Sequence, residues 1–185
     1  MGKVIVFNLT SLDGYFEGPN RNIDWHHVDD EFNEFAIEQL NTVNSLLFGR
    51  VTYELMSSYW PTVTAIKDDP IVAGKMNSLP KIVFSKTLSK ADWQNTRLIK
   101  SNFVGEISRL KKQSDKDNFI FGSSDLAVSL MDHGLVDEYR IMVNPVILGE
   151  GKPIFKGLKN KLELKFLKTR LFKSGNVLIY YEKAK

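Results

Sequence analysis

Over the first 134 residues, short apolar runs alternate with stretches in which apolar residues recur every three or four positions. The apolar runs are rich in β-branched and aromatic residues, which predicts buried strands. They span residues 3–9, 45–49, 81–85 and 118–122. The segments with helical spacing predict helices at 29–43, 50–59, 68–78, 101–113 and 123–134. This alternation of strands and helices is typical of an α/β protein.

Local signals mark several of the predicted helix ends. Asp69 precedes Pro70, which is the favoured order of an N-cap and a first helical residue. Acidic residues cluster after Asp29, where the positive end of a helix dipole favours them. The predicted helix at 123–134 ends at Gly134, and glycine readily adopts the left-handed conformation that ends a helix.

The pattern changes after residue 134, where apolar and polar residues alternate with a period of two. Tyr139, Ile141 and Val143 form one such set, and residues 162–166 form another. The turn sequence SGN (174–176) then leads into VLIYYEK (177–183). These segments predict antiparallel strands and therefore a mixed sheet. Because the chain shows neither linker nor repeat, we expect residues 1–185 to form a single domain.

Composition narrows the class of protein. The chain has 185 residues, of which 43% are hydrophobic and 25% charged, as in an ordinary globular protein. It contains no cysteine, which excludes disulfides, zinc–thiolate sites and a thiol nucleophile. The apolar run near the N-terminus is too short for a signal peptide or a membrane span. We therefore expect a cytoplasmic protein without a membrane partner.

Positive charge is concentrated in residues 152–173, which hold eight lysines and arginines and a single acidic residue, Glu163. One interpretation is an interface for nucleic acid. The other is a solvated surface on which lysines protect the edge of a sheet from unwanted pairing. We favour the second interpretation, and no nucleic-acid partner is expected.

A candidate anion site lies where the strand at 45–49 ends. Gly49 closes the strand, and Arg50 and Thr52 fall in the first turn of the next helix. Ligands of open α/β sheets bind at such strand ends, where helix N-termini present free N–H groups. The alternative is that Arg50 only pairs with Glu54 at helical i, i+4 spacing.

Two further strand ends carry similar residues. Polar donors follow the strand at 81–85, namely Ser85, Lys86 and Thr87. The strand at 118–122 ends in Gly122, and Ser123 and Ser124 then begin a helix, where Ser124 can equally be a plain helix-terminal residue. Three such turns in one sheet suggest one long phosphorylated ligand such as a dinucleotide. The chain lacks the GxGxxG motif of a Rossmann domain.

With these motifs the chain resembles a known family, the RibD C-terminal reductase domain of riboflavin synthesis, which has a dihydrofolate reductase-like fold. The resemblance rests on SLDG (11–14), GRVTYE (49–54), FSKTL (84–88), FGSSDL (121–126), GLVDEY (134–139) and NPVILGEGKPIF (144–155). It implies a three-layer α/β fold with a central, mostly parallel sheet, helices on both faces and an antiparallel C-terminal hairpin. It also implies a homodimer.

The resemblance implies that NADPH is the hydride donor. By it, Arg50 and Thr52 hold the cofactor phosphates, residues 85–87 face the adenosine end, and Gly122 and Ser123 bind the pyrophosphate. Many relatives have Gly-Gly where this chain has Gly122-Ser123. Ser123 still offers an N–H and a hydroxyl for the same purpose.

On the substrate side the candidates are scattered. Asp13 lies on the loop that borders the nicotinamide in the family, which suggests a catalytic role; the alternative is a turn residue that caps Gly14. Trp25 either stacks on a flat substrate or seals the core, and Glu150 either faces the pocket or lies in an exposed turn. The remaining substrate-binding candidates are Asn8, Ser11 and Asp30. His26 and His27 are adjacent and point apart, so no metal site is expected.

The sequence thus predicts an NADPH-dependent oxidoreductase that reduces a small heterocyclic or ribosylated molecule. By resemblance this is a 5-amino-6-(5-phosphoribosylamino)uracil reductase. Dihydrofolate reduction is an alternative, with Asp30 as the acid on the helix after Trp25. A nucleic-acid-binding module that uses residues 152–173 is a further alternative.

Overall fold

The computed structural model describes residues 1–184, and its centre is an eight-stranded sheet of order β5-β4-β3-β6-β1-β7-β10-β9. The strands are β1 (Val4–Thr10), β3 (Val43–Gly49), β4 (Lys81–Phe84), β5 (Thr96–Ile99), β6 (Asp117–Phe121), β7 (Glu138–Val143), β9 (Leu164–Leu171) and β10 (Val177–Lys183). From β5 to β7 all neighbours are parallel, and β10 and β9 complete the sheet in antiparallel pairing.

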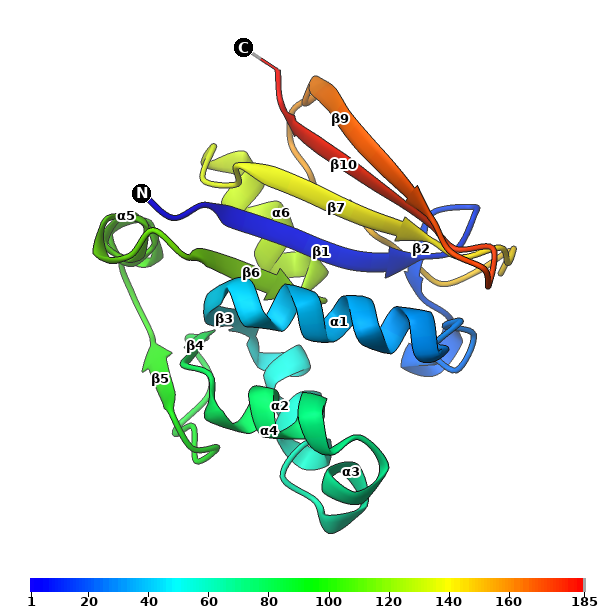
Figure 1. The fold of residues 1–185 in the computed structure, drawn as a ribbon. Coiled ribbons are helices and arrows are strands. Elements are labelled where there is room, and N and C mark those ends of the chain that lie inside the picture. The colour runs from blue at the N-terminus through cyan, green and yellow to red at the C-terminus, as the bar shows by residue number, and fades with distance from the viewer. Residues whose placement is uncertain (185) are drawn as a thin grey trace.

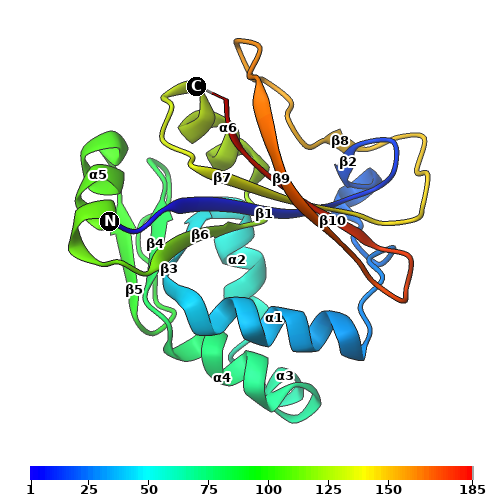
Figure 2. The same ribbon diagram turned by 45° about the horizontal axis from the view of Figure 1, so that its top comes forward.

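Helices cover both faces of the sheet (Figures 1 and 2). They are α1 (Asp30–Thr42), α2 (Arg50–Tyr59), α3 (Val63–Asp68), α4 (Pro70–Ser78), α5 (Phe103–Gln113) and α6 (Ser124–Asp132). Side chains of α1, α2 and α4 pack on one face around Phe7 and Phe48, while those of α5 and α6 pack on the other around Val6 and Ile120. The expected three-layer α/β fold is therefore confirmed.

A two-stranded sheet lies beside the main one. It pairs β2 (Tyr15–Glu17) with β8 (Lys152–Pro153), which are far apart in the sequence. A short 3-10 helix, η1 (Pro19–Arg21), follows β2. Gly151 fixes the spacing of the pair, because a Cβ atom there would lie only 2.2 Å from the carbonyl oxygen of Glu17.

The structure corrects several details of the sequence prediction. The strand β7 pairs in parallel with β1, so the antiparallel part begins at β10 and not directly after residue 134. The apolar pattern that contains Tyr139, Ile141 and Val143 runs on through residues 144–148 and predicts a strand over 137–148, but residues 144–148 form no strand. The elements β2, α3, β5 and β8 carry little apolar periodicity and are absent from the prediction. None of the helices within residues 1–184 has the length and apolar character that a membrane span requires.

Candidate functional site

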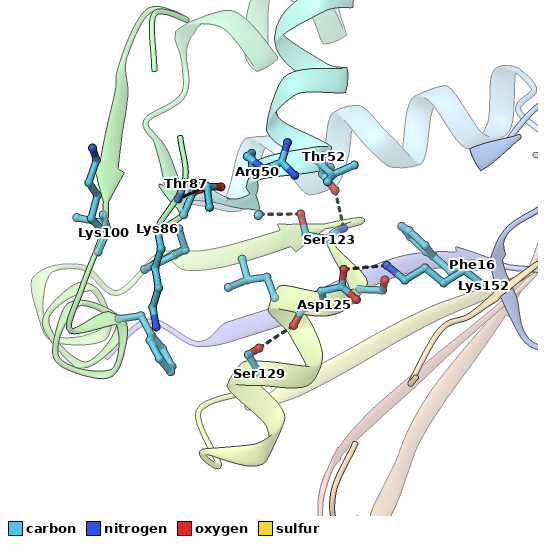
Figure 3. A pocket seen from close by; sticks show the side chains of 18 of the residues that line it. Phe16, Arg50, Thr52, Lys86, Thr87, Lys100, Ser123, Asp125, Ser129 and Lys152 are labelled. Atoms are coloured by element: carbon cyan, nitrogen blue, oxygen red, sulfur yellow. Dashed lines mark hydrogen bonds and ion pairs between the residues drawn. The ribbon is translucent and has the colours of Figure 1, made fainter. Parts of the chain in front are cut away.

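A cavity of about 670 Å3 lies at the carboxyl ends of β3, β4 and β6 (Figure 3). Parallel strands end at a common edge of the sheet, so the turns that follow them meet in space. The cavity is lined by eight of the nine residues expected to bind a cofactor: Gly49, Arg50, Thr52, Ser85, Lys86, Thr87, Ser123 and Ser124. The ninth, Gly122, is adjacent, because a Cβ atom there would lie 3.3 Å from Cγ2 of Thr52.

Two helices begin at this cavity without a side-chain cap. Among the six α-helices of the described chain, α1, α3, α4 and α5 are each capped by their own Asp, Thr or Asn side chain. The helices α2 and α6 have Gly49 and Ser123 at the N-cap, and neither residue caps its helix through a side chain. Uncapped N–H groups at the positive end of a helix dipole form a favourable place for an anion. The hydroxyl of Ser124, buried at the start of α6, also lacks a partner within residues 1–184.

Hydrogen bonds hold the starts of α2 and α6 together. The Ser123 N–H donates to the Thr52 hydroxyl (3.1 Å), and the Gly49 N–H donates to Oγ of Ser123 (3.0 Å). The Gly122 N–H donates to the carbonyl of Phe7. The N–H of Ser123, expected to face a pyrophosphate, is therefore engaged in this cross-link. The free donors at the start of α6 come from the residues that follow.

Ser123 has φ 52° and ψ 51°, a left-handed conformation that is unusual for a residue with a side chain. Glycine adopts this conformation without the steric cost of a Cβ atom, so a Gly-Gly pair at this turn would be less strained than Gly122-Ser123. Here the Ser123–Gly49 hydrogen bond offsets part of the conformational cost, which is about 1–2 kcal/mol.

Arg50 combines both roles considered for it. It lines the cavity as the first residue of α2, and its guanidinium donates to both carboxylate oxygens of Glu54 at 2.9 and 3.2 Å. Both side chains are about half exposed. An exposed pair of this kind contributes only about 0.3–0.5 kcal/mol, so a bound phosphate can compete for the guanidinium.

The cavity is positively charged. Its walls carry five cationic side chains, those of Arg21, Arg50, Lys86, Lys100 and Lys152, against two acidic ones, Glu17 and Asp125. Three of these cations, Arg21, Lys100 and Lys152, were not expected at the cofactor site from the sequence. Lys100 follows β5, a strand too short and too polar to be recognised, and Lys152 reaches the cavity only through the long-range pairing of β8 with β2.

Asp13 lies outside this cavity and is fully engaged in hydrogen bonds. Its carboxylate accepts from the Ser11 hydroxyl (2.6 Å) and from the N–H groups of Leu148 (3.1 Å) and Gly149 (2.8 Å). These bonds, that from Ser11 above all, hold the pKa of Asp13 below its usual range. Asp13 thus ties the loop after β1 to the loop after β7, which is a different role from capping Gly14. Its catalytic role stays a prediction that these contacts do not support.

The other substrate candidates do not converge on one cavity. Asp30 is exposed in the first turn of α1, and Glu150 lies in an exposed turn. Trp25 is half-buried and donates through Nε1 to the carbonyl of Asn22. Asn8 is buried, and neither polar atom of its amide has a partner within residues 1–184. In the same residues, His, Asp and Glu side chains nowhere form a group of three or more that could hold a metal ion.

The mostly parallel sheet, the helices on both of its faces and the antiparallel C-terminal strands place the protein in the dihydrofolate reductase-like class of α/β folds. Residues 2–178 match the RibD C-terminal domain family, and the chain belongs to this family. It is 36% identical over 185 residues to the uncharacterized protein YyaP of Bacillus subtilis (strain 168); the match covers 97% of this chain and 94% of YyaP.

Three solved structures share the fold. A provisionally assigned riboflavin biosynthesis protein of Shewanella sp. PV-4 superimposes with a TM-score of 0.77 at 23% identity, over 99% of both chains. A deaminase/5-amino-6-(5-phosphoribosylamino)uracil reductase of Thermotoga maritima gives 0.71 at 16% identity, over 99% of this chain and 57% of that one. Dihydrofolate reductase of Enterococcus faecalis, complexed with NADP(H), gives 0.66 at 14% identity, over 100% and 98%.

Proposed function

We propose that the protein is an NADPH-dependent oxidoreductase of the cytoplasm, folded as one domain, that reduces a small heterocyclic or ribosylated substrate. The observation that carries the proposal is the cavity at which α2 and α6 begin uncapped, surrounded by an excess of cationic side chains. This arrangement suits a diphosphate. NADPH, when bound there, would supply the hydride.

The outer part of the cavity suits the adenosine end of the cofactor. Lys86 follows β4 and Lys100 follows β5, and both line the cavity. A 2′-phosphate on the adenosine ribose would gain charge-assisted hydrogen bonds from lysines in this region. The residues expected from the sequence to face adenosine, Ser85 to Thr87, lie in the same wall. Here Oγ of Ser85 accepts from the N–H groups of Thr87 and Leu88 and shapes the turn.

NADPH is expected to bind more tightly than NADH, and Arg50→Ala is expected to weaken NADPH binding by roughly tenfold or more, since a charge-assisted bond contributes about 1.5–3 kcal/mol. Arg109→Ala is the matched control, because Arg109 pairs with Glu106 on α5 as Arg50 pairs with Glu54 on α2, but lies outside the cavity. Fluorescence titration measures all four affinities. Equal and weak binding of the two nucleotides by the wild type would contradict the cofactor proposal.

For the substrate we favour the ribosylaminopyrimidine over dihydrofolate. A folate reductase holds the pterin through a buried carboxylate, whereas Asp30 is exposed at the start of α1. The direct test is NADPH consumption with each substrate, side by side. Fast turnover of dihydrofolate that is lost in Asp30→Asn would replace the proposed substrate.

A homodimer is also proposed. Three large side chains of the C-terminal strands, Tyr139, Leu178 and Tyr180, are buried within the chain itself and need no partner. The apolar face that stays open lies opposite α1 on neighbouring strands, where Ile179 is paired with Ile141 and Val177 with Leu171. Ile141, Val177 and Ile179 are half-exposed and Leu171 is 73% exposed. A second copy of the chain would cover this row by symmetric packing.

Light scattering at micromolar concentration is expected to show a dimer for the wild type and a monomer for Leu171→Glu. Leu55→Glu serves as the control, because Leu55 is an exposed leucine on α2, away from the C-terminal strands. A monomeric wild type would remove the homodimer proposal and leave the cofactor proposal unaffected.

A further inference from the structure

One ion pair lies in the wall of the cavity. Nζ of Lys152 on β8 lies 2.9 Å from Oδ2 of Asp125 on α6, and both residues line the cavity (Figure 3). The pair connects the small β2–β8 sheet to the first turn of an uncapped helix. It is not part of either packed core.

Asp125 is the second residue of α6, next to the free N–H groups of that helix. A carboxylate there interacts favourably with the helix dipole. The same carboxylate repels any phosphate that approaches these N–H groups, because two like charges then share the same few ångströms. The acid at this position is therefore unfavourable for binding a diphosphate unless a cation compensates for it.

Lys152 is the compensating cation, and its main chain is fixed while its side chain is flexible. Its main chain is held by pairing with Glu17 in the β2–β8 sheet, and Gly151 packs against the same residue. The Lys152 side chain is 28% exposed, and that of Asp125 is 77% exposed. The ammonium group can thus turn from Asp125 toward the cavity without movement of the strand.

We propose that Lys152 is a ligand of the cofactor diphosphate and that Asp125 holds it away from this role until the nucleotide binds. Asp125 and the diphosphate then compete for one ammonium group. This inference rests on the proposed cofactor site and adds to it an internal competitor that lowers nucleotide affinity.

The proposal predicts effects of opposite sign for the two partners. Lys152→Met removes a phosphate ligand and is expected to weaken binding of ADP-ribose roughly tenfold. Asp125→Asn releases Lys152 and removes the repulsion between the carboxylate and the diphosphate. It is expected to tighten binding of ADP-ribose about two- to fivefold, because an exposed ion pair contributes little free energy. In the double variant the part of the gain that comes from releasing Lys152 disappears, and only the part that comes from removing the repulsion between Asp125 and the diphosphate remains.

Isothermal titration with two probes tests this. ADP-ribose carries the diphosphate, whereas 2′-AMP carries only the ribose phosphate, so the changes are expected for the first probe alone. Lys156→Met and Asp68→Asn are matched controls, because both residues are exposed charges outside the cavity. Thermal unfolding of each variant confirms that it is folded.

The outcomes separate the two proposals. Weaker or unchanged binding of ADP-ribose by Asp125→Asn would overturn the proposal that Asp125 competes for Lys152, because an ion pair with only a structural role gives one of these results. The proposed cofactor site would be unaffected. Equal changes for both probes overturn the assignment to the diphosphate. If the wild type binds neither ADP-ribose nor NADPH, the cofactor proposal falls and this inference falls with it.

Discussion

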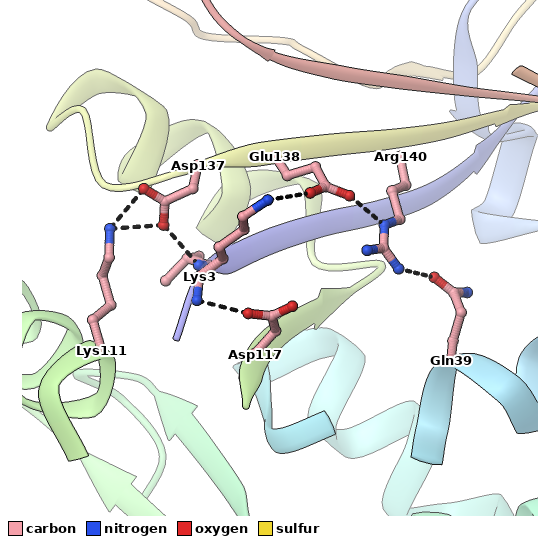
Figure 4. Close-up of polar contacts among 8 residues, drawn as sticks. Lys3, Gln39, Lys111, Asp117, Asp137, Glu138 and Arg140 are labelled. Carbon is pink, nitrogen blue, oxygen red and sulfur yellow. Dashed lines mark hydrogen bonds and ion pairs between the residues drawn. The ribbon is translucent and has the colours of Figure 1, made fainter. Parts of the chain in front are cut away.

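Replacing Glu138 by methionine is expected to lower the free energy of unfolding by about 3–5 kcal/mol, because it leaves the largely buried guanidinium of Arg140, 17% exposed, without its charged partner. Glu138 is buried at the start of β7, and its carboxylate accepts from Nε of Arg140 (2.7 Å) and Nζ of Lys3 (2.9 Å) (Figure 4). Arg140 also donates to Oε1 of Gln39 on α1 and lies over the ring of Phe119. Urea denaturation measures the loss.

Two comparisons make this prediction specific. In the double variant Glu138→Met/Arg140→Met both charges of the pair disappear together, so much of the lost stability is expected to return. Glu182→Met is the matched surface control, since Glu182 forms an exposed pair with Lys165 and its loss should cost about 1 kcal/mol or less. A loss of equal size for Glu138→Met and Glu182→Met would contradict the role of burial.

The same ion pairs imply a pH dependence. Burial raises the pKa of Glu138, but the hydrogen bond from Lys3 and the charge of Arg140 outweigh it and hold the pKa below its ordinary value of 4.5. A carboxyl group whose pKa is lower in the folded state binds fewer protons than in the unfolded state. Its contribution to stability is therefore complete above about pH 4.5 and is lost as the pH falls through the folded pKa. The double variant should show less of this acid sensitivity.

Much of the fold could be predicted because its signals are local. Arg50 to Tyr59 and Pro70 to Ser78 form helices where spacing and capping indicated them, and Asp69 is the N-cap of α4 as expected. The strand β5 was missed because Thr96 and Arg97 interrupt its apolar pattern at the edge of the sheet. The direction of β7 was missed because its alternating pattern is the one typical of antiparallel strands, although the crossover through α6 makes it parallel to β1.

The residues on the cofactor side of the candidate site could be predicted from local sequence, whereas the contacts on the substrate side could not. Each cofactor-side residue follows a buried strand directly, so a run of a few residues was enough to find it. The contacts of Asp13 could not be predicted, because Leu148 and Gly149 lie about 135 residues further along the chain. Lys152 depends on a similar long-range contact between β8 and β2. The position of a residue that is set by contacts distant in the sequence cannot be predicted from a local sequence pattern.

Gly122→Ala is expected to weaken NADPH binding by roughly tenfold or more, through misplacement of the first N–H groups of α6. Gly122 has φ +63°, and a Cβ atom there would lie 3.3 Å from Cγ2 of Thr52 and 3.5 Å from the ring of Phe16. Thr52 must then shift, and the hydrogen bond from the Ser123 N–H to its hydroxyl shifts with it. Because this bond holds the starts of α2 and α6 together, both uncapped helix ends lose their alignment with the ligand.

Gly134→Ala separates this effect from simple backbone strain. Gly134 follows α6 with φ +65°, almost the same as Gly122, so alanine at either position costs about 1–2 kcal/mol of stability for the left-handed conformation. At Gly134 the nearest atom to an added Cβ is the flexible Nζ of Lys183, at 3.7 Å, far from the cavity. Both variants should therefore melt at similarly lowered temperatures, while only Gly122→Ala loses affinity in a nucleotide titration. Equal loss of NADPH affinity in the two variants would show that strain alone is responsible and that the start of α6 does not bind the cofactor.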